Sequence, residues 1–283
     1  MKKCKVCGVQ ITTKPLAIKE NLEKMILWAE KAKKEFEPDL IVYPETITTT
    51  FSPGVSYEEF KKIVEPVPGY STDKMCELAK RLKVDIVLPM YELKDDKIYN
   101  DSIYIDCNGE ILGIYRKTHL FPTERLENNG WSTPGDEIVV IDSRFGKIGL
   151  IICYDGDFPE LSRMNALRGA EVIIRPSALL RSFDIWDMTN KARAYDNHVY
   201  MVSVNAVGPD GANNYFFGHS MIVGKDAHKI GLARGSEEIV CAELVLGETE
   251  KVSYGVGADR MFDHIDDRNL KAYTDELLKP RKK

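Results

Sequence analysis

The sequence lacks the features that mark several large classes of protein. Its 283 residues contain no run of about 18 apolar residues, which a membrane-spanning helix would need. The net charge is −5 and no basic cluster precedes the Lys279–Lys283 tail, which argues against nucleic acid as a partner. Met1-Lys2-Lys3 leads into a short strand-like run and not into the apolar segment of a signal peptide. We therefore expect a cytoplasmic protein that binds neither membrane nor nucleic acid.

Cysteine is scarce, with six residues, and in the cytoplasm we expect all six to be reduced. Cys4 and Cys7 have the CxxC spacing of a zinc ligand pair, but no second CxxC and no nearby His accompanies them. A strand from Lys5 to Gln10 explains the same residues. The sequence thus predicts no metal site.

The chain does contain an ordinary globular composition, 43% hydrophobic and 29% charged, in a length that suits one large α/β domain or two small ones. No linker and no repeat of about 20 to 50 residues divides it. We interpret residues 1–283 as a single domain. Its last part, residues 247–283, is a polar tail that we expect to be helical from Asp266 to Leu278 and to lie at a subunit interface.

Apolar spacing predicts strands that alternate with helices, and hairpins interrupt that alternation. The pattern favours mixed sheets, and the strands are too many for one sheet, so two sheets packed face to face with helices outside is the economical α/β arrangement. The predicted strands are 6–11, 40–43, 84–88, 99–105, 111–115, 139–141, 148–152, 172–175, 199–204, 220–223 and 239–246, and the helices are 16–37, 57–64, 71–82, 159–168 and 185–197.

The stretch from Lys147 to Leu161 has the pattern of a nucleophile's turn. A buried strand ends at Cys153, a short polar turn follows, and Pro159 suits the first turn of a helix. The backbone N–H groups after such a cysteine point to where an oxyanion would form. Taken alone, however, a small buried core residue is the simpler explanation of Cys153.

Glu45 and Lys117 also follow strands directly, and sites in α/β proteins gather beyond the carboxyl ends of strands. A thiol that attacks a carbonyl or nitrile carbon needs a base and a cation to hold the developing negative charge. Glu45 would be the base and Lys117 the cation. Singly, Glu45 could cap the next segment and Lys117 could be a solvated loop charge.

The residues around these positions decide between the two explanations. Three motifs occur in order, Tyr43-Pro44-Glu45, Tyr115 to Phe121, and Cys153-Tyr154-Asp155 followed by Phe158-Pro159-Glu160. With them the sequence resembles the nitrilase superfamily, the carbon–nitrogen hydrolases, over residues 5–245. The resemblance implies that family's four-layer αββα sandwich with two mixed β-sheets, a cysteine thioester mechanism and no cofactor.

The resemblance also implies a role for each site residue. Cys153 is the nucleophile, Glu45 the general base and acid, and Lys117 the oxyanion cation, with the backbone N–H of Tyr154 completing the oxyanion hole. Many members have a second glutamate between the Lys and the Cys. Glu124, seven residues after Lys117, suits the family's spacing better, and Glu127 is the alternative.

The residues after the nucleophile favour one part of the family. Tyr154-Asp155 is similar to the amidase and carbamoylase branches, and residues 169–176 and 205–220 resemble the aliphatic amidase and formamidase branch. We therefore expect a hydrolase that releases ammonia from a small linear amide. Hydrolysis of an N-carbamoyl amino acid or amine is the second candidate. Arg175 would favour it by holding a substrate carboxylate. The alternative explanation of Arg175 is a structural ion pair. Three more candidates are a nitrilase, a non-catalytic scaffold and an enzyme that transfers the acyl group to an amine.

Assembly and the pocket follow from the same resemblance. The family pairs its subunits through helices next to the nucleophile, which correspond here to residues 158–168 and 185–197. The first of these helices carries Leu161, Met164, Asn165 and Arg168. We expect a homodimer or a multiple of one. The loops 46–56, 121–133 and 176–186 are expected to line the substrate pocket.

Overall fold

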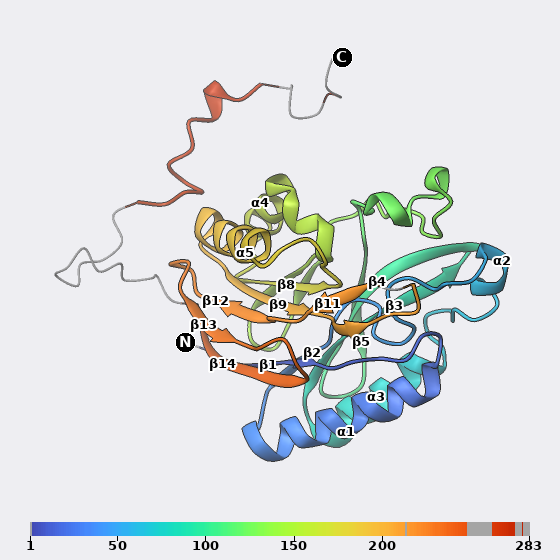
Figure 1. The fold of residues 1–283 in the computed structure, drawn as a ribbon. Coiled ribbons are helices and arrows are strands. Elements are labelled where there is room, and N and C mark those ends of the chain that lie inside the picture. The colour runs from blue at the N-terminus through green and yellow to red at the C-terminus, as the bar shows by residue number, and fades with distance from the viewer. Residues whose placement is uncertain (1, 213, 248–261, 275–278, 280–283) are drawn as a thin grey trace. The chain divides into compact units, whose positions relative to one another are not determined.

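A computed structural model describes residues 2–212, 214–247, 262–274 and 279 of the chain. Its internal contacts divide the chain into two compact units, Met1–Glu248 and Thr249–Lys283. The first unit holds both sheets and the helices that flank them (Figure 1). Within the described residues, none of the helices has the length and apolar character that a membrane crossing requires.

Two six-stranded sheets form the centre of the first unit, counted over the described residues. Each combines parallel strands in its middle, β1–β2–β3 or β7–β8–β9, with antiparallel strands at its edges, as the hairpins in the sequence predict. The spatial order is β14 (Glu238–Leu246), β1 (Lys2–Gln10), β2 (Leu40–Val42), β3 (Asp85–Lys94), β4 (Lys97–Ile105), β5 (Ile111–Arg116) in the first sheet and β13 (Lys229–Leu232), β12 (Met221–Val223), β9 (Tyr200–Asn205), β8 (Val172–Ser177), β7 (Lys147–Leu150), β6 (Val140–Asp142) in the second.

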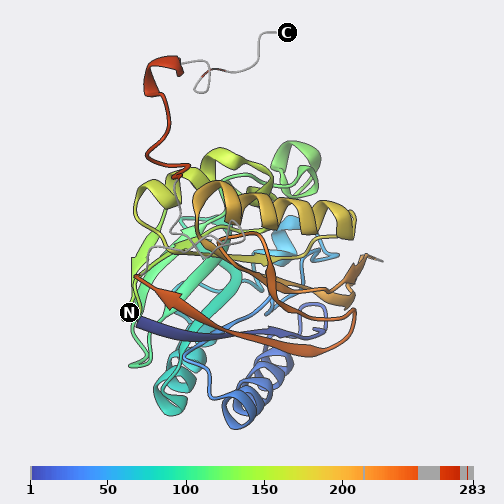
Figure 2. The same cartoon turned by 90° about the vertical axis from the view of Figure 1, so that its left-hand side faces the viewer.

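Helices cover the outer face of each sheet, so the layers run helix, sheet, sheet, helix (Figure 2). Helices α1 (Ile18–Phe36) and α3 (Tyr70–Leu82) pack on the first sheet, and α4 (Pro159–Leu167) and α5 (Phe183–Asn197) pack on the second. The fold is thus the predicted four-layer αββα sandwich. The short elements are α2 (Tyr57–Phe60), a ribbon of β10 (Val207–Pro209) with β11 (Tyr215–Phe217), and the 3₁₀ turns η1 (Pro122–Glu124), η2 (Leu126–Asn128) and η3 (Cys153–Asp157).

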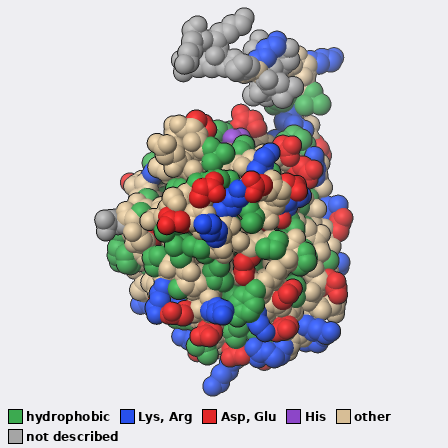
Figure 3. All heavy atoms as spheres, turned by 90° about the vertical axis from the view of Figure 1, so that its right-hand side faces the viewer, with side chains coloured by type: hydrophobic (Ala, Val, Ile, Leu, Met, Phe, Trp, Pro, Cys, Tyr) green, Lys and Arg blue, Asp and Glu red, His purple; other side chains and the backbone are tan. Residues whose placement is uncertain are grey.

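The alternation of side chains along a strand explains why both faces of the first sheet are buried. On β2, Leu40 and Val42 point into the core between the two sheets, whereas Ile41 packs with the residues under α1 and α3. On the face of the molecule in Figure 3, acidic and basic side chains lie close together with small apolar areas between them.

The expectation that all six cysteines are reduced is wrong for two of them. Cys7 on β1 and Cys241 on β14 form a disulfide, because the antiparallel register places them directly opposite each other with their Cα atoms 4.2 Å apart. Cys4, three residues earlier on β1, lies in the core between the sheets. Among the described residues, no three His, Cys, Asp or Glu side chains gather in a way that could hold a metal.

The expected helix from Asp266 to Leu278 is not found where the structure describes it. In the second unit, residues 262–274 form turns and one 3₁₀ turn, η4 (Leu270–Ala272). The Asp263 carboxylate accepts hydrogen bonds from the backbone N–H groups of Ile265 and Asp266. Such side-chain bonds offer the backbone an alternative to a helix. Residues 275–278 lie outside the described part, and the role of the tail stays a prediction.

Candidate active site

Residues from both sheets meet just beyond the carboxyl ends of their strands. Glu45 follows β2 and Lys117 follows β5 in the first sheet, while Cys153 follows β7 and Ala178 follows β8 in the second. The Ala178 N–H donates to Glu45 Oε2 at 2.7 Å, which connects the two halves. The prediction that strand ends bring these residues together therefore agrees with the geometry.

The Lys117 ammonium lies between two carboxylates. Its Nζ donates to Glu45 Oε1 at 2.7 Å and to Glu124 Oε2 at 2.5 Å, and all three side chains are fully buried. Asn100 on β4 bridges the same two acids, since its Nδ2 donates to Glu45 Oε1 at 2.8 Å and to Glu124 Oε1 at 2.9 Å. The sequence analysis did not single out Asn100, although a polar residue on a buried strand was a signal that could have found it.

The loop after Lys117 folds so that Glu124, and not Glu127, reaches this cluster. Glu124 ends the turn η1, and its carbonyl accepts the backbone N–H groups of Trp131 and Ser132. Gly130 permits this fold-back, because a Cβ there would lie 2.2 Å from the Glu124 carbonyl carbon. Glu127, one turn further, is exposed. Of the two candidates for the second glutamate, the geometry therefore supports Glu124.

Burial and neighbouring charge set the protonation of the cluster. Burial alone would lower the pKa of Lys117, but the Glu124 and Glu45 carboxylates outweigh it and hold that pKa above its ordinary value. Burial, together with the Glu45 carboxylate, raises the pKa of the Cys153 thiol to about 12, although Lys117 and Arg175 act to lower it. At neutral pH the thiol therefore keeps its proton until a base removes it.

Cys153 occupies a strained position at the start of η3. Its φ of +44° lies in the left-handed region, which residues other than glycine seldom adopt. The Asp155 carboxylate holds this turn in place: it accepts the Ile152 N–H at 2.9 Å, the Tyr115 hydroxyl at 2.7 Å and the His119 N–H at 2.9 Å. Asp155 thus ties the Cys153 turn to the segment that carries Lys117.

Arg175 does not reach the position that a substrate carboxylate would require. Its side chain is fully buried beneath the Cys153 turn, where Nε donates to the Cys153 carbonyl at 2.8 Å. The interpretation of Arg175 as a substrate-binding residue therefore does not fit the geometry, because its donors point into the protein. The arginine that does line the pocket is Arg181, which the sequence analysis did not name.

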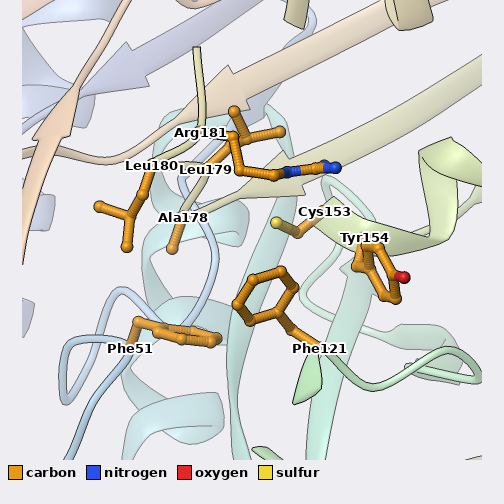
Figure 4. Close-up of a pocket in the computed structure, with 8 residues that line it drawn as sticks. All are labelled: Phe51, Phe121, Cys153, Tyr154, Ala178, Leu179, Leu180 and Arg181. Atoms are coloured by element: carbon orange, nitrogen blue, oxygen red, sulfur yellow. The ribbon is translucent and has the colours of Figure 1, made fainter. Parts of the chain in front are cut away.

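The cleft above Cys153 has mostly apolar walls (Figure 4). Its empty space is about 330 Å³ when the open mouth is included, and residues from all three loops expected to line it contribute to its walls. Phe51 and Phe121 form one side, and the Arg181 side chain runs along the other, toward Cys153 and Tyr154. Tyr154 also lines the cleft and stands second in η3, where backbone N–H groups have no partner within the turn. The cleft suits a small, largely uncharged group next to the thiol.

Comparison with known proteins assigns this site to a family. The sequence model of the carbon–nitrogen hydrolases matches residues 5–254. This chain belongs to the carbon–nitrogen hydrolase family. A probable nitrilase of Schizosaccharomyces pombe is 35% identical over 270 residues, with 92% of this chain and 97% of the relative covered. The omega-amidase NIT3 of Saccharomyces cerevisiae is 30% identical over 282 residues, with coverage of 94% and 96%.

Solved structures extend the likeness from sequence to fold. The crystal structure of Saccharomyces cerevisiae Nit3, a member of branch 10 of the nitrilase superfamily, superimposes with a TM-score of 0.78 at 30% identity, covering 87% of this carbon–nitrogen hydrolase and 91% of Nit3. An amidase from Nesterenkonia sp. gives the same TM-score at 22% identity, with 95% of each chain covered, which shows the shared fold.

The two glutamates offer a matched test of the cluster. Glu124→Gln should lower kcat by about hundredfold, because it removes one of the two charges that hold the Lys117 ammonium in place. Glu127→Gln should change kcat by less than about twofold, because an exposed carboxylate contributes little. Steady-state kinetics of both variants provide the measurement, and equal, mild effects would remove Glu124 from the site.

Proposed function

We propose that this carbon–nitrogen hydrolase cleaves the C–N bond of a small linear amide and releases ammonia through a thioester on Cys153. One observation carries the proposal: a buried ammonium, held by two buried carboxylates, lies beside a cysteine on a strained turn at the base of a small cleft. A scaffold protein would have no need for such charges, which cost free energy to bury. Relatives named as amidases, among them an (R)-stereoselective amidase that is 32% identical, also support amide hydrolysis.

In the first half of the reaction Glu45 acts as base and then as acid. It takes the Cys153 proton as the sulfur attacks the amide carbon, and the oxyanion is held by Lys117 and the Tyr154 N–H. Glu45 then gives this proton to the departing nitrogen. The C–N bond breaks, ammonia leaves and the acyl group remains as a thioester.

In the second half a water molecule replaces the amine. Glu45 removes one proton from the water, the resulting oxygen attacks the thioester carbon, and the C–S bond breaks. The proton on Glu45 returns to the Cys153 sulfur, so the acid product leaves and the enzyme is restored. Acyl transfer to an amine would follow the same path with the amine in the place of water.

The charge at the cleft wall favours a substrate with an anionic end. Arg181 is the one charged residue among those that line the cleft, within the described chain. Its Nη atoms bind Asp157, Nη2 at 3.0 Å from Oδ1, which fixes the guanidinium, and we propose that its Nε edge binds a carboxylate of the substrate. Both an amide with a carboxylate at its far end and an N-carbamoyl amino acid have such a group, so Arg181 takes over the role first given to Arg175.

Replacing the nucleophile tests the mechanism. Cys153→Ala should lower turnover by about a thousandfold or more while the protein stays folded, since the covalent path is lost. Ammonia release from an amide provides the measurement. The half-buried thiols supply matched controls, and Cys76→Ala and Cys107→Ala should keep near-normal activity. A Cys153→Ala enzyme with a tenth of the normal rate would contradict the mechanism.

A pair of amides of equal length tests the anionic preference. For the monoamide of glutaric acid, Arg181→Leu should lower kcat/KM by about tenfold, the value of one charged hydrogen bond. For pentanamide, which lacks the carboxylate, kcat/KM should not change. Arg168→Leu, an exposed arginine outside the cleft, is the control. An equal loss with both amides would assign Arg181 to the fold. An N-carbamoyl amino acid is included in the same panel. Its kcat/KM, compared with that of the amides, tests the second candidate function.

The outer helices support a homodimer. Met164 and Leu167 on α4 and Met188 on α5 are apolar residues with 40%, 42% and 60% of their surface exposed. Of the other residues expected along the first helix, Leu161 and Asn165 are buried against the sheet and Arg168 is exposed. Covering these apolar side chains with the same face of a second subunit would give an isologous interface.

Light scattering of the protein at micromolar concentration should therefore give a mass of a dimer or a multiple of one. A Met188→Lys change should shift the mass toward the monomer, because it places a charge in the apolar contact. A monomer from the unchanged chain would contradict this proposal and would leave the proposed chemistry untouched.

A further inference from the structure

A buried positive charge next to the nucleophile has no use in the mechanism above. Arg175, on β8, is enclosed on all sides and carries no exposed surface. Its Nε donates to the Cys153 carbonyl at 2.8 Å, and its Nη1 donates to Thr189 Oγ1 and Asn190 Oδ1 on α5, each at 2.9 Å. The guanidinium therefore links the Cys153 turn to the helix layer behind it.

This charge lacks a close carboxylate of its own. Within the described chain, Arg175 forms one ion pair, to Asp157 at 3.5 Å from Nη2, and Asp157 is already bound by both Nη atoms of Arg181. The Nη2 atom makes no hydrogen bond within that part of the chain. A buried, incompletely paired guanidinium is costly, so a structural role alone is a poor explanation for it.

The Cys153 turn leaves space for the guanidinium of Arg175. A Cβ on Gly156 would lie 2.1 Å from Arg175 Cζ, so no larger residue fits while Arg175 keeps its place. The approach brings the guanidinium to the backbone of the reacting residue itself. The Cys153 carbonyl belongs to the residue whose φ is +44°, and the hydrogen bond from Nε helps to hold that conformation.

The charge also completes the electrostatic balance of the reacting state. Once Glu45 has taken the thiol proton, the centre holds a thiolate and the Glu124 carboxylate against one ammonium, Lys117. The remaining negative charge is unfavourable in a buried site. Arg175 offsets it from β8 of the second sheet, whereas Lys117 and Glu45 follow strands of the first sheet.

We infer that Arg175 is a positioning residue that fixes the Cys153 turn through the Cys153 carbonyl and stabilises the Cys153 thiolate by its charge. The catalytic use of that thiolate rests on the proposed thioester mechanism. The thiolate itself can be measured without any substrate.

Alkylation of Cys153 by iodoacetamide between pH 6 and 10, followed by mass spectrometry of the Cys153 peptide, measures that thiolate. Arg175→Met should slow alkylation about tenfold at a fixed pH by shifting the pH profile to higher values. Arg175→Lys, which keeps the charge and loses the planar fork, should recover part of this loss. With substrate, kcat should fall with little change in KM.

Arg193 supplies the matched control. It reaches the same turn from α5, where it donates to the carbonyls of Gly156 and Asp157 but not to that of Cys153. Arg193→Met should therefore leave the alkylation profile of Cys153 unchanged. Should Arg175→Met fail to fold, Thr189→Val removes one acceptor of the guanidinium and should slow alkylation in the same direction but less. An unchanged profile in both Arg175→Met and Thr189→Val, or equal shifts in Arg175→Met and Arg193→Met, would overturn the inference.

These results are separable from failure of the proposed function. If the protein hydrolyses none of the amides but the alkylation profile moves as expected, the substrate is wrong and the inference stands. If amides are hydrolysed and the profile does not move, Arg175 belongs to the fold alone.

Discussion

The ion pair network around the Lys117 ammonium is the constraint on which the rest of the site depends. Lys117, Glu45 and Glu124 are completely buried, and each would be unstable there without the other two. Removing water from them strengthens their mutual attraction, but it requires that every remaining donor and acceptor be satisfied. Asn100 Nδ2 and the Ala178 N–H donate to carboxylate oxygens of this network, and they come from β4 in the first sheet and from the segment after β8 of the second. The chemistry thus requires the sandwich, because neither sheet alone can close the network.

How much of the fold and of the site could be predicted from the sequence depends on how far apart along the chain the interacting residues lie. Buried strands such as Ile148 to Leu150 follow from local apolar runs, and the mixed sheets follow from the Asn108-Gly109 hairpin signal. The shortened helix α2 and the strands β10, β11 and β13 have three or four residues each, too few for a clear periodic signal. The roles of Glu45, Lys117 and Cys153 could be predicted from the sequence because three motifs occur in a fixed order.

Contacts between segments that are far apart in the sequence could not be predicted in this way. No local pattern marks Cys7 as the partner of Cys241, because the pairing depends on the register of β1 with β14. Arg175 and Arg181 illustrate the same limit within one segment. Both are arginines near the end of β8, but one points under the Cys153 turn and the other lies along the cleft, and only the three-dimensional path of the chain separates them.

Asp157 connects the two arginines for which we propose different roles, Arg175 in positioning the Cys153 turn and Arg181 in binding the substrate. Asp157 fixes the guanidinium of Arg181 at the cleft wall and lies 3.5 Å from that of Arg175 beneath the turn. Its backbone carbonyl also accepts a hydrogen bond from Arg193. One carboxylate therefore restrains two cations that face opposite sides of the Cys153 turn. A single negative charge cannot neutralise both cations, which is consistent with the roles we propose for them, Arg175 toward the Cys153 thiolate and Arg181 toward an anionic end of the substrate. On the cleft side, the apolar walls formed by Phe51 and Phe121 lower the local polarity, which strengthens an interaction of Arg181 with a bound anionic group.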